Sequence, residues 1–200
     1  MARIDNKTGT KKETIIEAAA KLFYAKGFPA TTMRDLAEQL GVEAASLYNH
    51  IRSKSEILQE ICFAVANSFM DKMEEIDSSG AHSIDKLEQL LRLHIRQMIE
   101  RHEVVYVSDR EWKHLPDPYL SNYQNQRRVY RRRFAAIIEQ GIIKKEIKDV
   151  DAPTAVLIML HAISGIESWH RSKKKISGQL LEDNMVVILI QGMREKNKRP

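Results

Sequence analysis

Cysteine is almost missing from this sequence, because Cys62 is the single one among 200 residues. It cannot form an intramolecular disulfide, and a lone cysteine within an apolar helical pattern suits a reducing compartment. The longest apolar runs, such as 185–190, are far too short to cross a bilayer, and the N-terminal stretch lacks the apolar segment of a signal peptide. We therefore predict a cytoplasmic protein with no membrane partner.

Glycine and proline are also scarce, with 8 and 5 residues, and no run that alternates polar and apolar residues is long enough for a strand. Apolar residues instead recur at three- and four-residue spacing in almost every segment, which is the pattern of amphipathic helices. The hydrophobic share of 43% can support one globular domain, or a small domain joined to a larger one. We predict an all-α fold.

Charge of one sign does not dominate, because 32 Lys and Arg face 27 Asp and Glu, for a net charge of +5. This excess permits a polyanionic partner, but most of the charged residues are expected on a solvated surface. The sequence contains no P-loop, no Gly-rich dinucleotide turn, no Ser/His/Asp arrangement and no Cys-based zinc spacing. We expect no catalytic residue, no metal and no cofactor, and hence a protein that is not an enzyme.

Capping residues and glycines mark the ends of the expected helices. In the first third they predict helices from the capping box of Thr10 and Glu13 to Gly27, from Thr32 to Gly41, over 43–50, and from the capping box of Ser53 and Glu56 to 77. Small polar residues at 78–83 form the clearest linker. Later helices are expected at 84–105, 108–114, 118–140, 152–173 and 178–196.

The segment 31–54 contains two short helical patterns hinged at Gly41, as a helix-turn-helix requires. Its apolar positions would lock the pair onto the first helix: Leu36, Ala37, Leu40, Val42, Leu47 and Ile51. An ordinary helical hairpin shows the same pattern, but the polar groups left facing outward favour DNA. The side chains that can donate to phosphate oxygens are Thr32, Tyr48, Asn49, His50 and Lys54.

The first sixty residues resemble the TetR family of bacterial transcriptional regulators. The similarity lies in the stretches 16–23, 27–28, 31–32, 36–42 and 46–54, which read IEAAAKLF, GF, TT, LAEQLGV and SLYNHIRSK. The resemblance implies a three-helix DNA-binding head over residues 1–55. It also implies a helical ligand-binding and dimerisation body over residues 56–200, and a repressor of transcription that binds a double-stranded DNA operator.

The tip of the expected recognition helix departs from the family, because Glu43, Ala44 and Ala45 replace its usual small polar residue, basic residue and glycine. No Arg or Lys is available there for bidentate contact with guanine. We expect the Glu43 carboxylate to cap the helix, and the two alanines to contact thymine methyl groups, so that the operator is A·T-rich at those positions. The side chains expected to hydrogen-bond to base edges are Ser46, Asn49 and Arg34.

A single head buries too little DNA surface to be selective, so two heads should bind the half-sites of a near-palindrome. The last two helical patterns, within 155–166 and 180–193, carry apolar residues on more than one face. Such helices can pack against both the body and a second subunit, which predicts a homodimer. The alternative is that they lie wholly inside their own subunit.

Aromatic residues make up only 6% of the sequence but gather in its middle. A site lined by aromatic rings and methionine, with a few polar groups, suits a small apolar or amphipathic effector. Taken singly, each of these residues is better explained as part of a core. The expected ligand-binding residues are His94, Met98, Trp112, Tyr123, Arg127, Tyr130, Phe134 and Trp169.

The stretch 109–175 also resembles the body of TetR-type regulators that sense acyl-CoA thioesters. The similar residues are Arg110-Glu111-Trp112, Leu115-Pro116, 123–134, Gly165 and Trp169-His170-Arg171. This resemblance implies an acyl-CoA effector whose phosphates would pair with arginines of 127–133, since guanidinium groups suit such oxyanions. The alternative is that these arginines form a solvated helix face.

Two other classes of function fit parts of the sequence. A DNA-binding or architectural protein without an effector would need the same head. A di-iron helical-bundle enzyme would use the Glu-x-x-His spacing found at 111–114 and 167–170. Two such pairs are only a small excess over chance, and a di-iron site needs further glutamates on two other helices.

Overall fold

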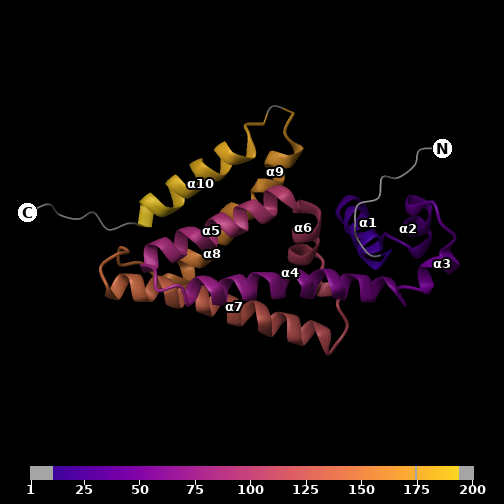
Figure 1. Cartoon of the computed structure of the whole chain (residues 1–200), viewed down its shortest axis with the longest axis horizontal. Coiled ribbons are helices and arrows are strands. Elements are labelled where there is room, and N and C mark those ends of the chain that lie inside the picture. The colour runs from indigo at the N-terminus through magenta and orange to yellow at the C-terminus, as the bar shows by residue number, and fades with distance from the viewer. Residues whose placement is uncertain (1–10, 174, 194–200) are drawn as a thin grey trace, which may run out of the picture. The chain divides into compact units, whose positions relative to one another are not determined.

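The computed structural model describes residues 11–173 and 175–193, and in this part of the chain every regular element is a helix (Figure 1). This confirms the all-α fold. The elements are α1 (Lys11–Lys26), α2 (Met33–Leu40), α3 (Ala44–Tyr48), α4 (Lys54–Asp77), α5 (Ser83–Glu100), α6 (His102–Arg110), the 3-10 turn η1 (Trp112–His114), α7 (Tyr119–Ile143), α8 (Ala152–Ser164), α9 (Ile166–Arg171) and α10 (Gly178–Met193).

Three expected helices are broken where periodicity alone predicts continuity. The helix over 108–114 is divided at Glu111 into the end of α6 and the 3-10 turn η1. The helix over 84–105 is split at Arg101, whose φ of −128° and ψ of 39° end α5 before α6 begins. The helix over 152–173 is divided into α8 and α9 at Gly165. The expected capping box at Thr10 and the expected end of the last helix at residue 196 lie outside the described residues.

The chain forms two compact units. The first consists of residues up to Ala66 together with Glu103–Tyr123, and the second of Asn67–His102 and the residues from Gln124 onward. Both α4 and α7 contribute residues to each unit. The boundary between residues 55 and 56 stays a prediction.

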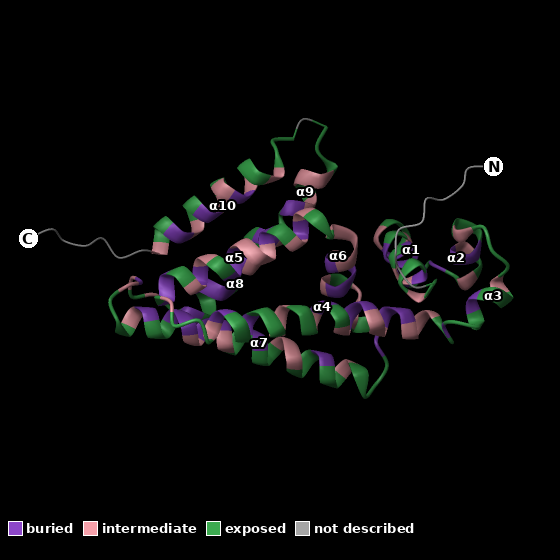
Figure 2. Ribbon diagram, viewed as in Figure 1, coloured by how far each residue is buried: buried purple, intermediate pink, exposed green. Residues whose placement is uncertain are grey.

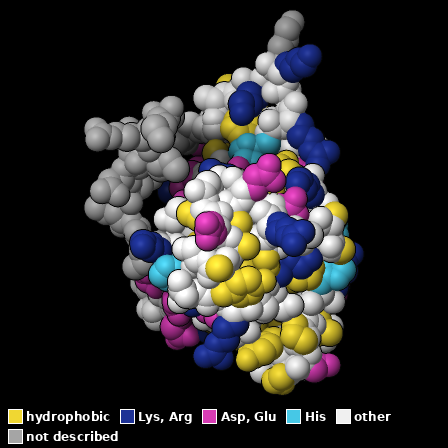
Figure 3. Space-filling view, turned by 90° about the vertical axis from the view of Figure 1, so that its right-hand side faces the viewer, with side chains coloured by type: hydrophobic (Ala, Val, Ile, Leu, Met, Phe, Trp, Pro, Cys, Tyr) yellow, Lys and Arg dark blue, Asp and Glu magenta, His cyan; other side chains and the backbone are white. Residues whose placement is uncertain are grey.

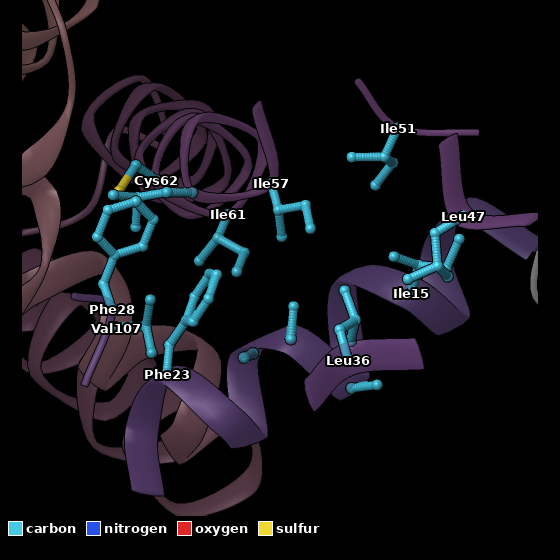
Figure 4. Close-up of a cluster of buried hydrophobic side chains, with 14 of the residues drawn as sticks. Ile15, Phe23, Phe28, Leu36, Leu47, Ile51, Ile57, Ile61, Cys62 and Val107 are labelled. Atoms are coloured by element: carbon cyan, nitrogen blue, oxygen red, sulfur yellow. The ribbon is translucent and has the colours of Figure 1, made fainter. Parts of the chain in front are cut away.

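The core of the first unit joins α1, α2, α3 and the beginning of α4. Figure 4 shows Phe23 of α1, Leu47 of α3 and Ile57 of α4 among its buried side chains, all at most 2% exposed. Burial of such a side chain contributes roughly 1.5–3 kcal/mol, so this cluster fixes the short helices that cannot persist alone. Of the apolar positions expected to lock the hairpin, Val42 differs, because it is 42% exposed.

The second unit is arranged around α5, which packs against α8, α9 and α10. The inward side chains of α5 are completely buried, namely Leu87, Leu90, Leu91 and Ile95. Along α10, buried and exposed residues alternate (Figure 2). The Glu146 carboxylate accepts hydrogen bonds from the backbone N–H groups of Ser83 (2.6 Å) and Ile84 (3.4 Å). It thereby caps the start of α5. Among the described helices, none combines the length and apolar character needed to span a bilayer.

Candidate nucleic-acid interface and effector region

Helix α2 is held at both ends by the residues that the sequence indicated. The Thr32 hydroxyl accepts a hydrogen bond from Asp35 N–H (3.1 Å), and the Asp35 carboxylate accepts one from Thr32 N–H (2.7 Å). Hydrogen bonds from the Thr32 side chain and backbone, and then from Lys26, hold the pKa of Asp35 far below its usual value. Gly41 ends the helix at φ +65°, a left-handed conformation that glycine adopts without strain.

Helix α3 presents one buried side and one exposed side. Leu47 and the following Ile51 are at most 2% exposed and anchor it to the core. The exposed residues are Ala45, Ser46, Tyr48, Asn49 and His50. All five are predicted to contact DNA, and the structure brings them together within and just after one short helix.

The remaining predicted contacts are less uniform. Arg34 of α2 is exposed, and Ala44 is half-buried. Figure 3 views the molecule from the side on which Figure 1 draws α2 and α3, and it shows hydrophobic, basic and acidic side chains interspersed. Contact with a polyanion would therefore depend on individual side chains at this face.

Thr32 and Lys54 have structural partners in place of the free donors expected from the sequence. The Thr32 hydroxyl also donates to the Asp35 carboxylate (2.6 Å), which completes its capping interactions. The Lys54 ammonium donates to the carbonyl oxygens of Phe28 (2.7 Å), Thr31 (2.7 Å) and Pro29 (3.3 Å). It also lies 4.4 Å from the centre of the Phe28 ring. Lys54 thus ties α4 to the turn between α1 and α2.

Lys54→Met is expected to lower the free energy of unfolding by about 1.5–3 kcal/mol, the usual contribution of hydrogen bonds to a charged group. The apolar stem is kept, but carbonyl groups in a partly buried turn lose their donor. Denaturant unfolding would measure the loss. If Lys54 instead contacted a DNA phosphate, the substitution would reduce the steepness of the salt dependence of DNA binding by about 0.9 and leave stability unchanged. That pattern would restore the role predicted from the sequence.

The predicted effector residues do not form one group. In the second unit, His94 of α5 stacks on Phe69 of α4 with ring centres 4.3 Å apart. The His94 Nε2 atom hydrogen-bonds to the Tyr130 hydroxyl (2.7 Å), and Phe134 lies against the same rings. Burial raises the pKa of the Tyr130 hydroxyl, so it stays protonated. We call Phe69, His94, Tyr130 and Phe134 the aromatic cluster.

Phe69 was missed in the sequence because it is one of many apolar residues at helical spacing in α4. Only its pairing with a histidine on another helix singles it out. The cluster combines apolar rings with one polar pair, as a site for an apolar ligand requires.

Trp112 and Tyr123 belong to the first unit. Their ring centres are 6.2 Å apart, and the Tyr123 hydroxyl bonds to both the side chain (2.7 Å) and the carbonyl (2.9 Å) of Ser108. Tyr123 is 2% exposed. Its hydroxyl is thus satisfied within the protein, as a buried core tyrosine requires.

Trp169, Met98 and Arg127 have other surroundings. The Trp169 Nε1–H donates to the carbonyl of Ile176 (3.0 Å). The neighbouring His170 donates from Nε2 to the carbonyl of Met98 (2.8 Å), which links α9 to α5. Arg127 is half-buried on α7. Binding of an effector by any of these residues stays a prediction.

The arginines of α7 differ in their partners. Arg133 pairs with Glu74 (2.6 Å) and Asp77 (3.2 Å) of α4 and so ties two helices together. Arg128, Arg131 and Arg132 are exposed. The stretch therefore includes both a structural ion pair and a solvated basic face.

An exposed apolar face lies on α8 and α10. Its exposed large side chains are Leu157, Ile158, Leu180, Val187 and Ile188. A groove of about 330 Å³ runs along it, lined among others by Ile158, Met159 and Ile188. Helix α8 contains no Asp, Glu, Lys or Arg. We call this surface the α8–α10 face.

Comparison with known proteins identifies the head and the body. Residues 15–61 match the bacterial regulatory proteins of the tetR family, and residues 80–193 match the tetracyclin repressor-like C-terminal domain. The chain belongs to the TetR family. It is thus a helix-turn-helix transcriptional regulator, as its first sixty residues indicated.

The relatives of this TetR-family chain are named as repressors. KstR2 of Mycobacterium tuberculosis is 22% identical over 198 residues, which cover 98% of this chain and 99% of KstR2. KstR2 of Rhodococcus jostii is 27% identical, with 94% of this chain and 92% of that protein covered. The biofilm operon regulator IcaR of Staphylococcus aureus, named a negative transcriptional regulator, is 30% identical, with 80% and 82% covered.

Solved structures share the fold. The M. tuberculosis KstR2 structure superposes with a TM-score of 0.87 at 22% identity and covers 97% of this chain and 100% of its own. AibR, solved in complex with isovaleryl coenzyme A and operator DNA, gives a TM-score of 0.78 at 21% identity and covers 90% and 98%. These similarities establish the two-part helical architecture.

The two Glu-x-x-His pairs differ. In the pair at 111–114, the His114 Nε2 atom lies 3.4 Å from the Glu111 carboxylate, whereas the pair at 167–170 makes other contacts. Glu167 accepts a hydrogen bond from Arg171, and His170 is bonded to the Met98 carbonyl. Within residues 11–173 and 175–193, no three His, Cys, Asp or Glu side chains gather where they could hold a metal ion. The named relatives are transcriptional repressors, so family membership gives no support to the enzyme alternative.

Proposed function

We propose that this chain represses transcription as a homodimer on a near-palindromic operator and is released by a small apolar or amphipathic effector. The observation that carries the DNA-binding part is α3, whose inner side is buried while Ala45, Ser46, Tyr48, Asn49 and His50 stay exposed. A helix held in this way can enter the major groove and still reach base edges. Repression is the function named for the KstR2 and IcaR relatives.

The homodimer is supported by the α8–α10 face. Contiguous exposed apolar surface on a regulator marks an interaction site. Helix α8 has no Asp, Glu, Lys or Arg, so its part of this surface offers no ion pair to an acidic or basic partner. An apolar patch is complementary to a second copy of itself, as a two-fold interface requires.

The operator can be found by selecting bound duplexes from a pool of randomised DNA with the purified full chain. We expect two inverted half-sites separated by about one helical turn or a multiple of it. Single half-sites would contradict the dimer, and recovery of no common sequence would contradict specific DNA binding itself.

The proposed effector class is an acyl-CoA thioester. The aromatic cluster supplies apolar surface with one polar pair, and exposed arginines of α7 can pair with phosphates. AibR, which shares the fold, has been solved with isovaleryl coenzyme A and operator DNA together. The aromatic rings suit the apolar acyl group of such a ligand, and the guanidinium groups suit the phosphates of its coenzyme A part.

We expect a matching acyl-CoA to weaken operator binding about 5- to 150-fold, which corresponds to a coupling of roughly 1–3 kcal/mol. Mobility-shift titrations with thioesters of different acyl chains would measure this, with free coenzyme A as the control for the acyl group. Tyr130→Phe should reduce the release and leave operator affinity without effector unchanged. Identical operator affinity with every thioester would remove this ligand class.

One observation favours an effector-independent regulator. Phe134 is completely buried, and the rings of the aromatic cluster stack within contact distance of one another, as in a solid core. In that case no metabolite would raise the unfolding temperature of the chain. Thermal shift measurements with the same thioesters separate the two functions.

A further inference from the structure

Glu43 occupies the N-cap position of α3 but does not cap it. Its backbone has the extended φ of −71° and ψ of 141° typical of an N-cap, yet its side chain makes no hydrogen bond to the helix. The residue is exposed, and its carboxylate has no hydrogen bond or ion pair to any other residue in the described ranges 11–173 and 175–193. This corrects the expectation that the carboxylate satisfies the first N–H groups of the helix.

Local stability does not account for glutamate at this place. N-cap positions favour Ser, Thr, Asp and Asn, whose short side chains reach the N–H groups of the first turn. Thr32 and Asp151 use this chemistry at the starts of α2 and α8. Glu43 instead carries a longer side chain whose acceptor atoms stay available.

The neighbours of Glu43 leave its carboxylate as the longest side chain at the tip. Ala44 and Ala45 extend no further than a methyl group, and the exposed hydroxyl of Ser46 is also short. When α3 enters the major groove, such a tip lets the backbone approach the bases closely. The carboxylate is then the group at this position that can span the remaining distance to a base edge.

A carboxylate accepts hydrogen bonds and cannot donate them at neutral pH. In the major groove guanine presents two acceptors and thymine presents one beside its methyl group, so both repel it. Adenine offers its N6 amine beside the N7 acceptor, whereas cytosine offers its N4 amine without a neighbouring acceptor. Cytosine is therefore the base that a carboxylate recognises best.

We infer that Glu43 is a specificity-determining residue that accepts a hydrogen bond from the N4 amine of a cytosine in each half-site. The inference rests on the proposed function, because it requires α3 to lie in the major groove. Each half-site then contains a fixed C·G pair beside the A·T pairs that the alanines are expected to contact. By symmetry, the near-palindrome carries this pair twice.

The test compares operators selected by the full-length wild-type chain, Glu43→Gln and Glu43→Ser. The wild type should prefer cytosine at one pair of symmetry-related positions by about 5- to 150-fold, the range expected for one base contact. Glu43→Gln should shift that preference to adenine, because an amide can both donate to N7 and accept from N6. Glu43→Ser should lose the preference there while its thermal stability stays equal or rises.

Glu38→Gln on α2 is the matched control, since it removes an exposed carboxylate from the same head. It should leave the selected base at this position unchanged. If Glu43→Gln selects the same bases as the wild type, or strengthens binding to all sequences alike, the carboxylate reads no base and the inference is overturned. If the wild type selects no common sequence at all, the proposed operator binding fails, and this inference fails with it.

Discussion

Ile158→Glu is expected to convert the protein to a monomer and to weaken operator binding about 10²- to 10⁴-fold, the gain that linking two half-site contacts provides. Ile158 is 58% exposed on the isolated chain and lines the groove of the α8–α10 face. A two-fold interface would bury the new carboxylate twice without a partner, and burial of an unpaired charge is strongly unfavourable. Sedimentation or light scattering gives the oligomeric state, and a shift assay gives the affinity.

Ile143→Glu provides the control for this substitution. Ile143 is 81% exposed at the end of α7, so the chemical change is the same on a residue that does not belong to the α8–α10 face. It should leave both the dimer and the operator affinity unchanged. Loss of the dimer in both variants would point to a general effect of charge, and retention of the dimer in Ile158→Glu would place the interface elsewhere.

Glu182→Ala is expected to destabilise the chain by about 2–3 kcal/mol, measured by denaturant unfolding. The Glu182 side chain is only 3% exposed and accepts hydrogen bonds from Arg92 (2.8 Å) and Arg96 (2.8 and 2.9 Å) of α5. Removing one partner of a buried ion pair usually costs 3–5 kcal/mol. We expect less here because Arg96 is 54% exposed and water can solvate it.

The same carboxylate predicts a dependence of stability on pH. Burial raises the pKa of Glu182, but the hydrogen bonds from Arg96 and Arg92 lower the pKa by more than burial raises it. The pKa is therefore below the usual 4.5. Its stabilising contribution is therefore complete above about pH 4.5 and is lost as the pH falls through the folded-state pKa. Unfolding curves between neutral and acid pH should converge for the wild type and Glu182→Ala.

Asp183→Asn is the matched control for both measurements. Asp183 is the next residue on α10 and also contacts Arg92 (3.2 Å), but its side chain is 48% exposed. The effect on stability should be within about 1 kcal/mol, as is usual for exposed ion pairs. An equal loss in both variants would mean that the burial of Glu182 is not what makes its contacts important.

Because α10 carries part of the α8–α10 face, Glu182→Ala should also weaken the dimer.

The sequence determined the features that depend on residues close together in the chain. Helical periodicity gave the all-α fold, because amphipathic spacing within one segment decides which side is buried. Thr32 with Asp35, and Gly41 after Leu40, placed α2 correctly, since a cap acts over three or four residues. The helix-turn-helix and its family could be predicted for the same reason.

The tertiary structure decided how distant residues pair. The ammonium of Lys54 reaches carbonyl groups 23 to 26 residues earlier in the chain, and this contact, which no local pattern encodes, removes it from the exposed donors. Glu182 lies four residues before Val186 and eight before Ile190 on the buried stripe of α10, where an apolar residue would be expected. Its burial is possible because Arg92 and Arg96 approach from a helix about 90 residues away.

The predicted effector residues illustrate the same limit. Composition could show that aromatic residues gather in the middle of the sequence, but Trp112 and Tyr123 pack in one unit while His94 and Tyr130 meet in the other. Helical spacing gives the inward side of each helix, whereas the helix that faces it follows from packing of the whole chain. The sequence by itself therefore determined the helices, the DNA-binding motif and the family, and only the tertiary structure decided which polar groups are paired and which, like the Glu43 carboxylate, remain available to bind.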